Sequence, residues 1–282
     1  MPVMEIPMPL IKKILFPVDF SPACVSVARY VEAFAGQFEA EIMLFHVVGP
    51  GDGELTLAEE LLPLRQAQLN AFLADELKYF STERLCVTGD EPAPEIVAAA
   101  QRWRPDLVMM PTHGLGVFQK FFFGSVAADI LRDLDCPVWT SVHSEIPLPL
   151  EDIHCRRILV ALDLTERSQK VLAWAASLAA EYEAVLGIVH VTAEMPLAYT
   201  AVSLEKDLTR SVSEGATKEI EAFQKAVGTT ARVFVRSGDS PAVIAGAAKD
   251  FDADLLVIGR HESGPDDAYA ILRDSPCPVI GI

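Results

Sequence analysis

The chain has 282 residues, of which 51% are hydrophobic, and its formal net charge is −17. This length fits two domains of ordinary size that each bury a core, and the hydrophobic content is too high for a disordered chain. The negative charge argues against binding to nucleic acid or to an anionic membrane, because both need a basic surface on the protein.

Strands and helices are predicted to alternate along the first half of the chain. Its apolar runs lack clean alternation and are separated by amphipathic stretches, which is typical of parallel strands covered by helices on both faces. Pro92 lies where the first turn of a helix tolerates a missing amide hydrogen. The predicted strands are 14–19, 41–48, 84–87, 107–110 and 137–142, and the predicted helices are 22–37, 59–80, 92–103 and 126–134.

The second half repeats the first. The sequence KILFPVDFS at residues 13–21 is matched by RILVALDLT at residues 157–165, and Cys-Pro-Val occurs at both 136–138 and 277–279. A repeat this long indicates a duplicated domain rather than a solenoid of short units. The predicted strands of the second half are 158–163, 184–191, 231–236, 255–258 and 278–282, and its predicted helices include 167–182, 203–227 and 241–251.

The expected fold class is therefore α/β, with two tandem doubly wound domains that are each built on a five-stranded parallel sheet. We expect the domains to span residues 1–146 and 152–282. The segment 144–152 contains Pro147 and Pro149. Two prolines in so short a segment favour an extended, semi-rigid linker over a flexible tether.

The loop at residues 111–126 contains the best candidates for a binding site, because ligands of doubly wound sheets bind outside the carboxyl ends of the strands. Gly114 and Gly116 allow backbone to approach a ligand closely. Residues 124–126 open a helix, whose free amides and positive dipole end favour phosphate. A second interpretation stays open, in which the glycines only form a tight turn and Ser125 only caps a helix. The sequence has no Walker A motif, and no GxGxxG follows its first predicted strand.

Two aspartates and two histidines lie near predicted strand ends. Asp19 and Asp163 each end the first strand of their half, where a carboxylate can contact a nucleoside or can cap the next helix; both interpretations stay open. His46 and His190 lie near the ends of the second strands. Because no other metal-binding residue stands at ligand spacing, we expect these histidines to pack in the fold.

The sequence also predicts where the protein is found. No apolar run reaches the roughly 18–20 residues that cross a bilayer, and the N-terminus lacks the basic start and apolar core of a signal peptide. The five cysteines show no CxxC pair and no metal-type spacing. They are expected to be structural thiols in a reducing compartment. We therefore expect a cytoplasmic protein without membrane or nucleic-acid partners.

These motifs resemble the universal stress protein family in its tandem-domain form, over essentially the whole chain. The nucleotide loop of that family is usually Gly-x2-Gly-x9-Gly-Ser/Thr. Gly114, nine intervening residues and Gly124-Ser125 match its last three elements, whereas Pro111 replaces its first glycine. The resemblance implies a fold like that of the adenine nucleotide alpha hydrolases, with the two domains paired through their last strands. It leaves open whether two chains associate as a homodimer.

The resemblance further implies that the first half binds ATP, and it leaves open whether Mg²⁺ accompanies the nucleotide. The Pro-Val-Asp segment at the end of the first predicted strand resembles the acidic motif with which the family contacts adenosine. The site residues that the resemblance implies are Pro17, Val18, Asp19, Val47, Met110, His113, Gly114, Gly116, Gly124, Ser125 and Val126.

The second half lacks most of this loop, so one nucleotide site per chain is expected. It keeps Gly259, but Glu262 stands where the next glycine of the motif belongs. The segment between His261 and Cys277 is seven residues shorter than the one between His113 and Cys136. Acidic residues in this shorter segment would also oppose a triphosphate.

Three functions remain open. The first is an ATP-binding stress-response or regulatory protein that has unknown protein partners and at most slow ATP hydrolysis, because the loop lacks a P-loop lysine and an arginine finger. The second is a tandem scaffold that binds other proteins and no nucleotide. The third is an adenylyl-transferring enzyme, for which the sequence offers no nucleophile or acid–base set.

Overall fold

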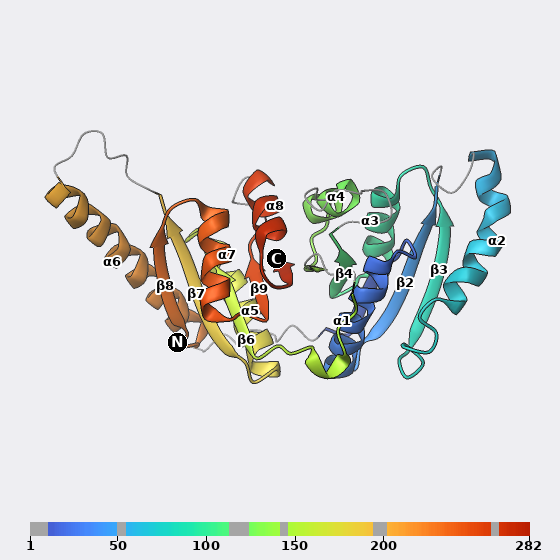
Figure 1. The fold of residues 1–282 in the computed structure, drawn as a ribbon, viewed down its shortest axis with the longest axis horizontal. Coiled ribbons are helices and arrows are strands. Elements are labelled where there is room, and N and C mark those ends of the chain that lie inside the picture. The colour runs from blue at the N-terminus through green and yellow to red at the C-terminus, as the bar shows by residue number, and fades with distance from the viewer. Residues whose placement is uncertain (1–10, 50–54, 113–123, 142–145, 194–201, 261–264) are drawn as a thin grey trace. The chain divides into compact units, whose positions relative to one another are not determined.

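The computed structural model describes residues 11–49, 55–112, 124–141, 146–193, 202–260 and 265–282. The described chain divides into two compact units, residues 11–154 and residues 155–282. Each unit holds a five-stranded parallel sheet with helices packed against it (Figure 1). The predicted α/β class and the tandem repeat of the fold are confirmed.

The first unit has the strand order β3-β2-β1-β4-β5. The chain moves outward from β1 to β3, then returns past β1 to β4. Because crossovers between parallel strands are right-handed, this reversal places α1 and α2 on one face and α3 and α4 on the other. Its elements are β1 (Lys13–Pro17), α1 (Pro22–Phe38), β2 (Glu41–Val48), α2 (Leu55–Ala71), β3 (Thr82–Thr88), α3 (Pro92–Trp103), β4 (Leu107–Pro111), α4 (Ser125–Asp133) and β5 (Val138–Ser141).

The second unit repeats this topology, with the strand order β8-β7-β6-β9-β10. A short 3-10 helix, η2 (Leu150–Asp152), precedes it and belongs to the first unit. The elements of the second unit are β6 (Arg157–Ala161), α5 (Ser168–Glu181), β7 (Val185–Thr192), α6 (Val202–Val227), β8 (Arg232–Ser237), α7 (Ser240–Phe251), β9 (Leu255–Ile258), α8 (Pro265–Asp274) and β10 (Val279–Gly281).

The central strands form the core of each unit. Ile14, Leu15 and Phe16 of β1 are fully buried, as are Ile158 and Leu159 of β6. Each such side chain contributes about 1.5–3 kcal/mol when it leaves water. Because both faces of these strands are covered, they read as unbroken apolar runs in the sequence.

A carboxylate ties the first strand of each unit to the strand beside it. Asp106 precedes β4, and its Oδ2 accepts hydrogen bonds from the amides of Lys12 and Lys13 at 2.8 and 3.0 Å. Asp254 precedes β9, and its Oδ2 accepts from the amides of the two corresponding residues, 156 and 157, at 2.8 and 2.9 Å. The duplication has therefore preserved this interaction at the amino ends of both sheets.

The predicted helix at 59–80 is wrong at its C-terminal end, because α2 stops at Ala71. Leu73 has a φ of 55°, in the left-handed region that ends helices. The residues that follow form turns, in which the Leu77 amide still donates to the Leu73 carbonyl at 3.0 Å. Leu69, Leu73 and Leu77 are all buried at a spacing of four residues. That spacing imitates a continuing helix in the sequence.

Candidate functional site

In the first unit the strand order reverses between β1 and β4, and the space outside the carboxyl ends of these strands, here called the crevice, is the topological switch point. Doubly wound sheets bind their ligands at such a switch point. The ends of β2, β1 and β4 lie in a row, because β1 pairs with both of its neighbours. Neighbouring strands lie about 4.8 Å apart, so the ends of β2 and β4 are roughly 10 Å apart. This span fits a nucleoside at one end and its phosphates at the other.

Asp19 braces the turn that follows β1. Its Oδ1 accepts hydrogen bonds from the Ser21 amide at 3.0 Å and from the Cys24 thiol at 3.2 Å. Phe20, which lies between Asp19 and Ser21 in the chain, has a φ of 63°, which is strained for an aromatic residue. The side chain of Ser21, rather than that of Asp19, caps α1 by accepting from the Cys24 amide. Asp19 thus stabilises the turn that follows β1. The helix-capping role, which was the other interpretation of Asp19, is filled by Ser21.

The same turn occurs in the second unit. Asp163 accepts from the Thr165 amide at 3.1 Å and from the Ser168 hydroxyl at 2.6 Å through its Oδ1. Leu164 has a φ of 64°, almost the value found at Phe20. Because the strained turn occurs in both units, the fold requires it, whether or not the unit binds a ligand. The aspartate by itself therefore does not distinguish a binding domain from a non-binding one.

Val18 and Val47 lie at the carboxyl ends of β1 and β2, and both are buried. The Val18 amide donates to the Phe45 carbonyl at 2.9 Å, and the ring Nδ1 of His46 donates to the Val18 carbonyl at 2.8 Å. The His46 ring also packs on Phe20, with the centroids 4.5 Å apart. His190 makes the equivalent bond to the Leu162 carbonyl at 2.7 Å. Both histidines fasten the end of the second strand to the end of the first, which is a packing role.

Met110 and Thr112 form the β4 side of the crevice. Met110 pairs with Thr140, and Pro111 pairs with Ser141 as the last residue of β4. The Gly124 amide donates to the Thr112 carbonyl at 2.9 Å, which joins the end of β4 to the start of α4. Thr112 was not among the predicted site residues. It acts through its backbone, which no side-chain pattern reveals.

The start of α4 offers unused amide donors to the crevice. Gly124 is the N-cap, with φ −65° and ψ 140°, and no side chain caps the helix. Ser125 is an exposed residue at the first helical position, so it does not cap α4 as the second interpretation held. Within the described part of the chain, nothing accepts from the amides of Ser125, Val126 and Ala127. Such a set of donors at the positive end of a helix favours an anion.

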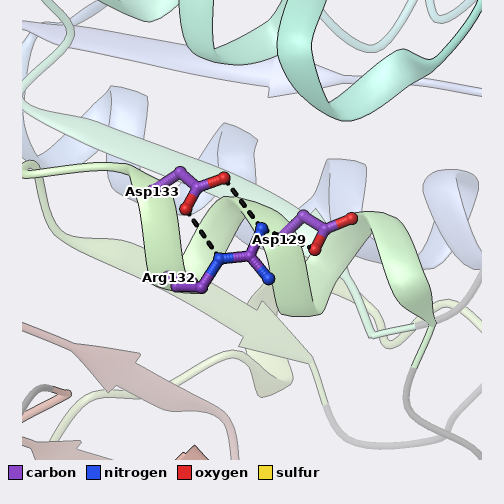
Figure 2. A network of polar contacts seen from close by, with 3 residues as sticks. All are labelled: Asp129, Arg132 and Asp133. Carbon is purple, nitrogen blue, oxygen red and sulfur yellow. Dashed lines mark hydrogen bonds and ion pairs between the residues drawn. The ribbon is translucent and has the colours of Figure 1, made fainter.

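The charges of α4 lie in its second half, away from these donors (Figure 2). The Arg132 guanidinium contacts Asp129 at 2.8 Å and Asp133 at 2.8 and 2.9 Å. Arg132 lowers the pKa of the Asp133 carboxyl by donating these hydrogen bonds. The pKa of Arg132 is raised in turn, mainly by its hydrogen bonds to the two carboxylates. The first turn of α4 therefore carries no acidic side chain that would repel a phosphate.

The corresponding helix of the second unit begins differently. Its first residue is Pro265, which has no amide hydrogen, and residues 266 and 267 of its first turn are aspartates. β9 ends at Ile258, and the buried Arg260 follows, its amide donating to the Ile282 carbonyl at 3.1 Å. The start of α8 thus has one amide donor fewer than that of α4 and carries two acidic residues.

Eight of the predicted site residues lie at the carboxyl ends of β1, β2 and β4 or at the start of α4. Three of them end β1 or follow it, one lies in β2, one in β4, and three begin α4: Pro17, Val18, Asp19, Val47, Met110, Gly124, Ser125 and Val126. His113, Gly114 and Gly116, and Glu262 of the second half, lie outside the described residues.

The fold and the crevice define a class: a tandem pair of doubly wound α/β domains, with an anion-compatible helix start in the first. The model of the universal stress protein family matches this chain twice, over residues 10–141 and 154–281. The chain belongs to the universal stress protein family. Both domains are members, which confirms the tandem form.

Individual relatives agree with this assignment. A universal stress protein of Methanocaldococcus jannaschii is 32% identical over 140 residues, which cover 46% of this chain and 81% of the relative. Universal stress protein A homolog 1 of Coxiella burnetii is 31% identical over 140 residues, covering 46% of this chain and 97% of the relative. The crystal structure of a universal stress protein from Archaeoglobus fulgidus has a TM-score of 0.68 at 19% identity and covers 95% of each chain. This last likeness concerns the fold alone.

In the described residues, no helix is both long and apolar enough to cross a membrane.

Proposed function

We propose that this protein is a stress-response regulator that binds one molecule of ATP in its first domain and acts in the cytoplasm. The observation that carries the proposal is the set of three unused amides at the start of α4, beside the switch point of the sheet. A triphosphate is the part of ATP that such donors favour. The nucleoside would then lie toward Val18 and Val47, at the ends of β1 and β2.

The protein's overall charge makes the local arrangement important. At a net charge of −17, long-range attraction brings no nucleotide to this surface. Binding must therefore come from close hydrogen bonds at the helix start and from burial of the base. Mg²⁺ carried by the nucleotide would lower the repulsion, and it would be held mainly by phosphate oxygens and water.

Rapid hydrolysis is not part of the proposal. The site lacks a P-loop lysine and an arginine finger in the sequence, and these groups stabilise the charge of the transferred phosphoryl group in fast enzymes. Asp19 Oδ1 is engaged by the Ser21 amide and the Cys24 thiol, so the carboxylate serves the turn. ATP would act as a bound ligand that changes the surface offered to partner proteins.

The proposal is tested by measuring nucleotide in the purified protein and by titrating ATP with and without Mg²⁺ in a calorimeter. We expect close to one equivalent per chain. Gly124→Asp should abolish binding, because it places a carboxylate at the phosphate position. The backbone of Gly124 suits aspartate, which is a good N-cap, so the variant should keep its stability. Gly264→Asp, the equivalent change before α8, should leave binding intact.

Two results would contradict the proposal. Absence of ATP from both measurements would favour a scaffold that binds proteins and no nucleotide. Equal loss of binding in the two glycine variants would contradict the assignment of the site to the first domain. Steady turnover at about 1 per second or faster, an ordinary enzyme rate, would favour an enzyme instead.

A further inference from the structure

Beside the end of β2 lie two residues that the predicted site does not include, Gly89 and Glu95. Gly89 follows β3, and its amide donates to the Val48 carbonyl at 3.1 Å. A Cβ at Gly89 would lie 2.5 Å from Cγ of Glu95 and 3.2 Å from Cγ1 of Val47. The side chains of Glu95 and Val47 therefore flank the same small space, which only glycine leaves open. This contact brings the first turn of α3 to the end of β2.

Glu95 reaches this position with its carboxylate available. The residue is half-buried and lies in the first turn of α3. No described residue hydrogen-bonds to its carboxylate. A carboxylate is an acceptor only, so the group that satisfies it must carry an N–H or O–H.

The second domain lacks this carboxylate. The N-caps of α3 and α7 are Glu91 and Asp239, and five residues beyond each cap lies a buried isoleucine that faces the sheet. The residue before that isoleucine is Glu95 in the first domain and Val243 in the second. The acceptor is thus present only in the domain that also offers free amides at its last helix.

We propose that Glu95 accepts a hydrogen bond from the nucleoside of the bound nucleotide and so contributes to its selection. The inference rests on the ATP site proposed above. The nucleoside offers two kinds of donor, the ribose hydroxyls and the exocyclic amino group of adenine, and a carboxylate accepts from either. In other doubly wound folds an acidic side chain near the end of the second strand accepts from the ribose. Glu95 also lies near the end of the second strand, although it belongs to α3.

The test compares wild type with Glu95→Gln and Glu95→Val, using ATP, 2′-deoxy-ATP, 3′-deoxy-ATP and ITP as titrants. We expect Glu95→Val to weaken ATP binding roughly tenfold, the usual effect of losing a hydrogen bond to a charged group, and Glu95→Gln to weaken it less, because its amide oxygen still accepts a hydrogen bond. The analogue that lacks the recognised donor should bind the wild type about as weakly as ATP binds the variants. Its affinity should not change when Glu95 is substituted. A deoxy analogue with this behaviour identifies a ribose hydroxyl, and ITP identifies the amino group.

Glu91→Gln is the matched control, because Glu91 is an exposed N-cap of the same helix without a side-chain hydrogen bond. If Glu91→Gln weakens ATP binding as much as Glu95→Gln does, the cause is the charge at the start of α3 and the inference is wrong. Unchanged selectivity in both Glu95 variants, with ATP still bound, overturns the inference but leaves the ATP site standing. Failure of wild type to bind any of the four nucleotides overturns both. Glu95→Gln keeps the shape of the side chain, so it remains informative even if Glu95→Val does not fold.

Discussion

The Gly124 amide donates a hydrogen bond to the Thr112 carbonyl oxygen at 2.9 Å. This bond closes the two ends of the segment 113–123, which contains most of the family's nucleotide loop. It also uses one of the four amides that a helix start leaves unpaired. Only the donors of the next three residues remain for a ligand, which makes each of them testable.

Ser125→Pro should remove one donor without disturbing the helix. Proline suits the first helical position, and the ψ of 140° at Gly124 suits a residue before proline. The α8 helix of the second domain begins with proline in this way. We expect ATP affinity to fall about tenfold or more, since a hydrogen bond to a charged group contributes about 1.5–3 kcal/mol. Calorimetry measures the affinity, and circular dichroism verifies the helix.

Ser125→Ala is the control for this prediction, because it removes the hydroxyl and keeps the amide. It should weaken ATP less than the proline variant does. Equal losses in the two variants would show that the hydroxyl, and not the backbone donor, contacts the nucleotide.

Gln66→Leu should destabilise the first domain and expose its sheet edge. β3 is an edge strand, and the Gln66 side chain accepts from the Cys86 amide at 2.9 Å and donates to the Arg84 carbonyl at 3.1 Å. Leucine leaves both backbone groups without this partner, at a cost of about 1–3 kcal/mol. Urea unfolding measures the loss, and light scattering should show more association through the uncovered edge. Gln68→Leu on the exposed side of α2 should do neither.

Asp106→Ala and Asp254→Ala should each weaken their own domain. Each change removes a carboxylate that accepts from two adjacent backbone amides, and we expect a loss of about 1–2 kcal/mol at these partly exposed sites. Trp103 and Trp139 report on the first domain and Trp174 on the second. In urea unfolding followed by tryptophan fluorescence, Asp106→Ala should therefore shift the transition of the first domain. Asp254→Ala should shift the transition of the second domain. Identical shifts would show that the domains unfold as one unit.

Two buried thiols and one half-buried thiol should make the protein less stable at alkaline pH. Burial raises the pKa of Cys24 and of Cys155 to about 12 and that of Cys277 to about 11, from 9.0. The folded state therefore keeps its thiols protonated where the unfolded chain ionises them. This stabilisation is complete below pH 9 and is lost as the pH rises toward 11 and 12, at about 1.4 kcal/mol for each pKa unit.

Unfolding free energies measured from pH 8 to 11 test this dependence. Cys24→Ala should flatten the curve, because it removes one of the three groups. The folded protein should also react slowly with iodoacetamide at pH 8, where denatured protein reacts quickly, because the thiolate is the nucleophile. Fast alkylation of Cys24 in the folded state would contradict its burial beside Asp19.

The class of the fold and the duplication follow from the sequence alone. Apolar runs such as residues 41–48 are long, unbroken and bounded by turns, so their burial in a parallel sheet follows from local pattern alone. The loop motif and the aspartates after the first strands also predicted a site at the carboxyl ends of the strands. These are properties of residue type and spacing, which a single chain displays directly.

The hydrogen-bond partner of each polar group becomes visible only in the folded structure. The structure assigned the cap of α1 to Ser21 and the brace of the turn to Asp19, although both residues suit either role. It also brought Glu95 beside Val47, because Gly89 leaves room between two segments that are far apart in sequence. Hydrogen bonds and close approaches of this kind depend on positions in space, so composition and periodicity do not encode them.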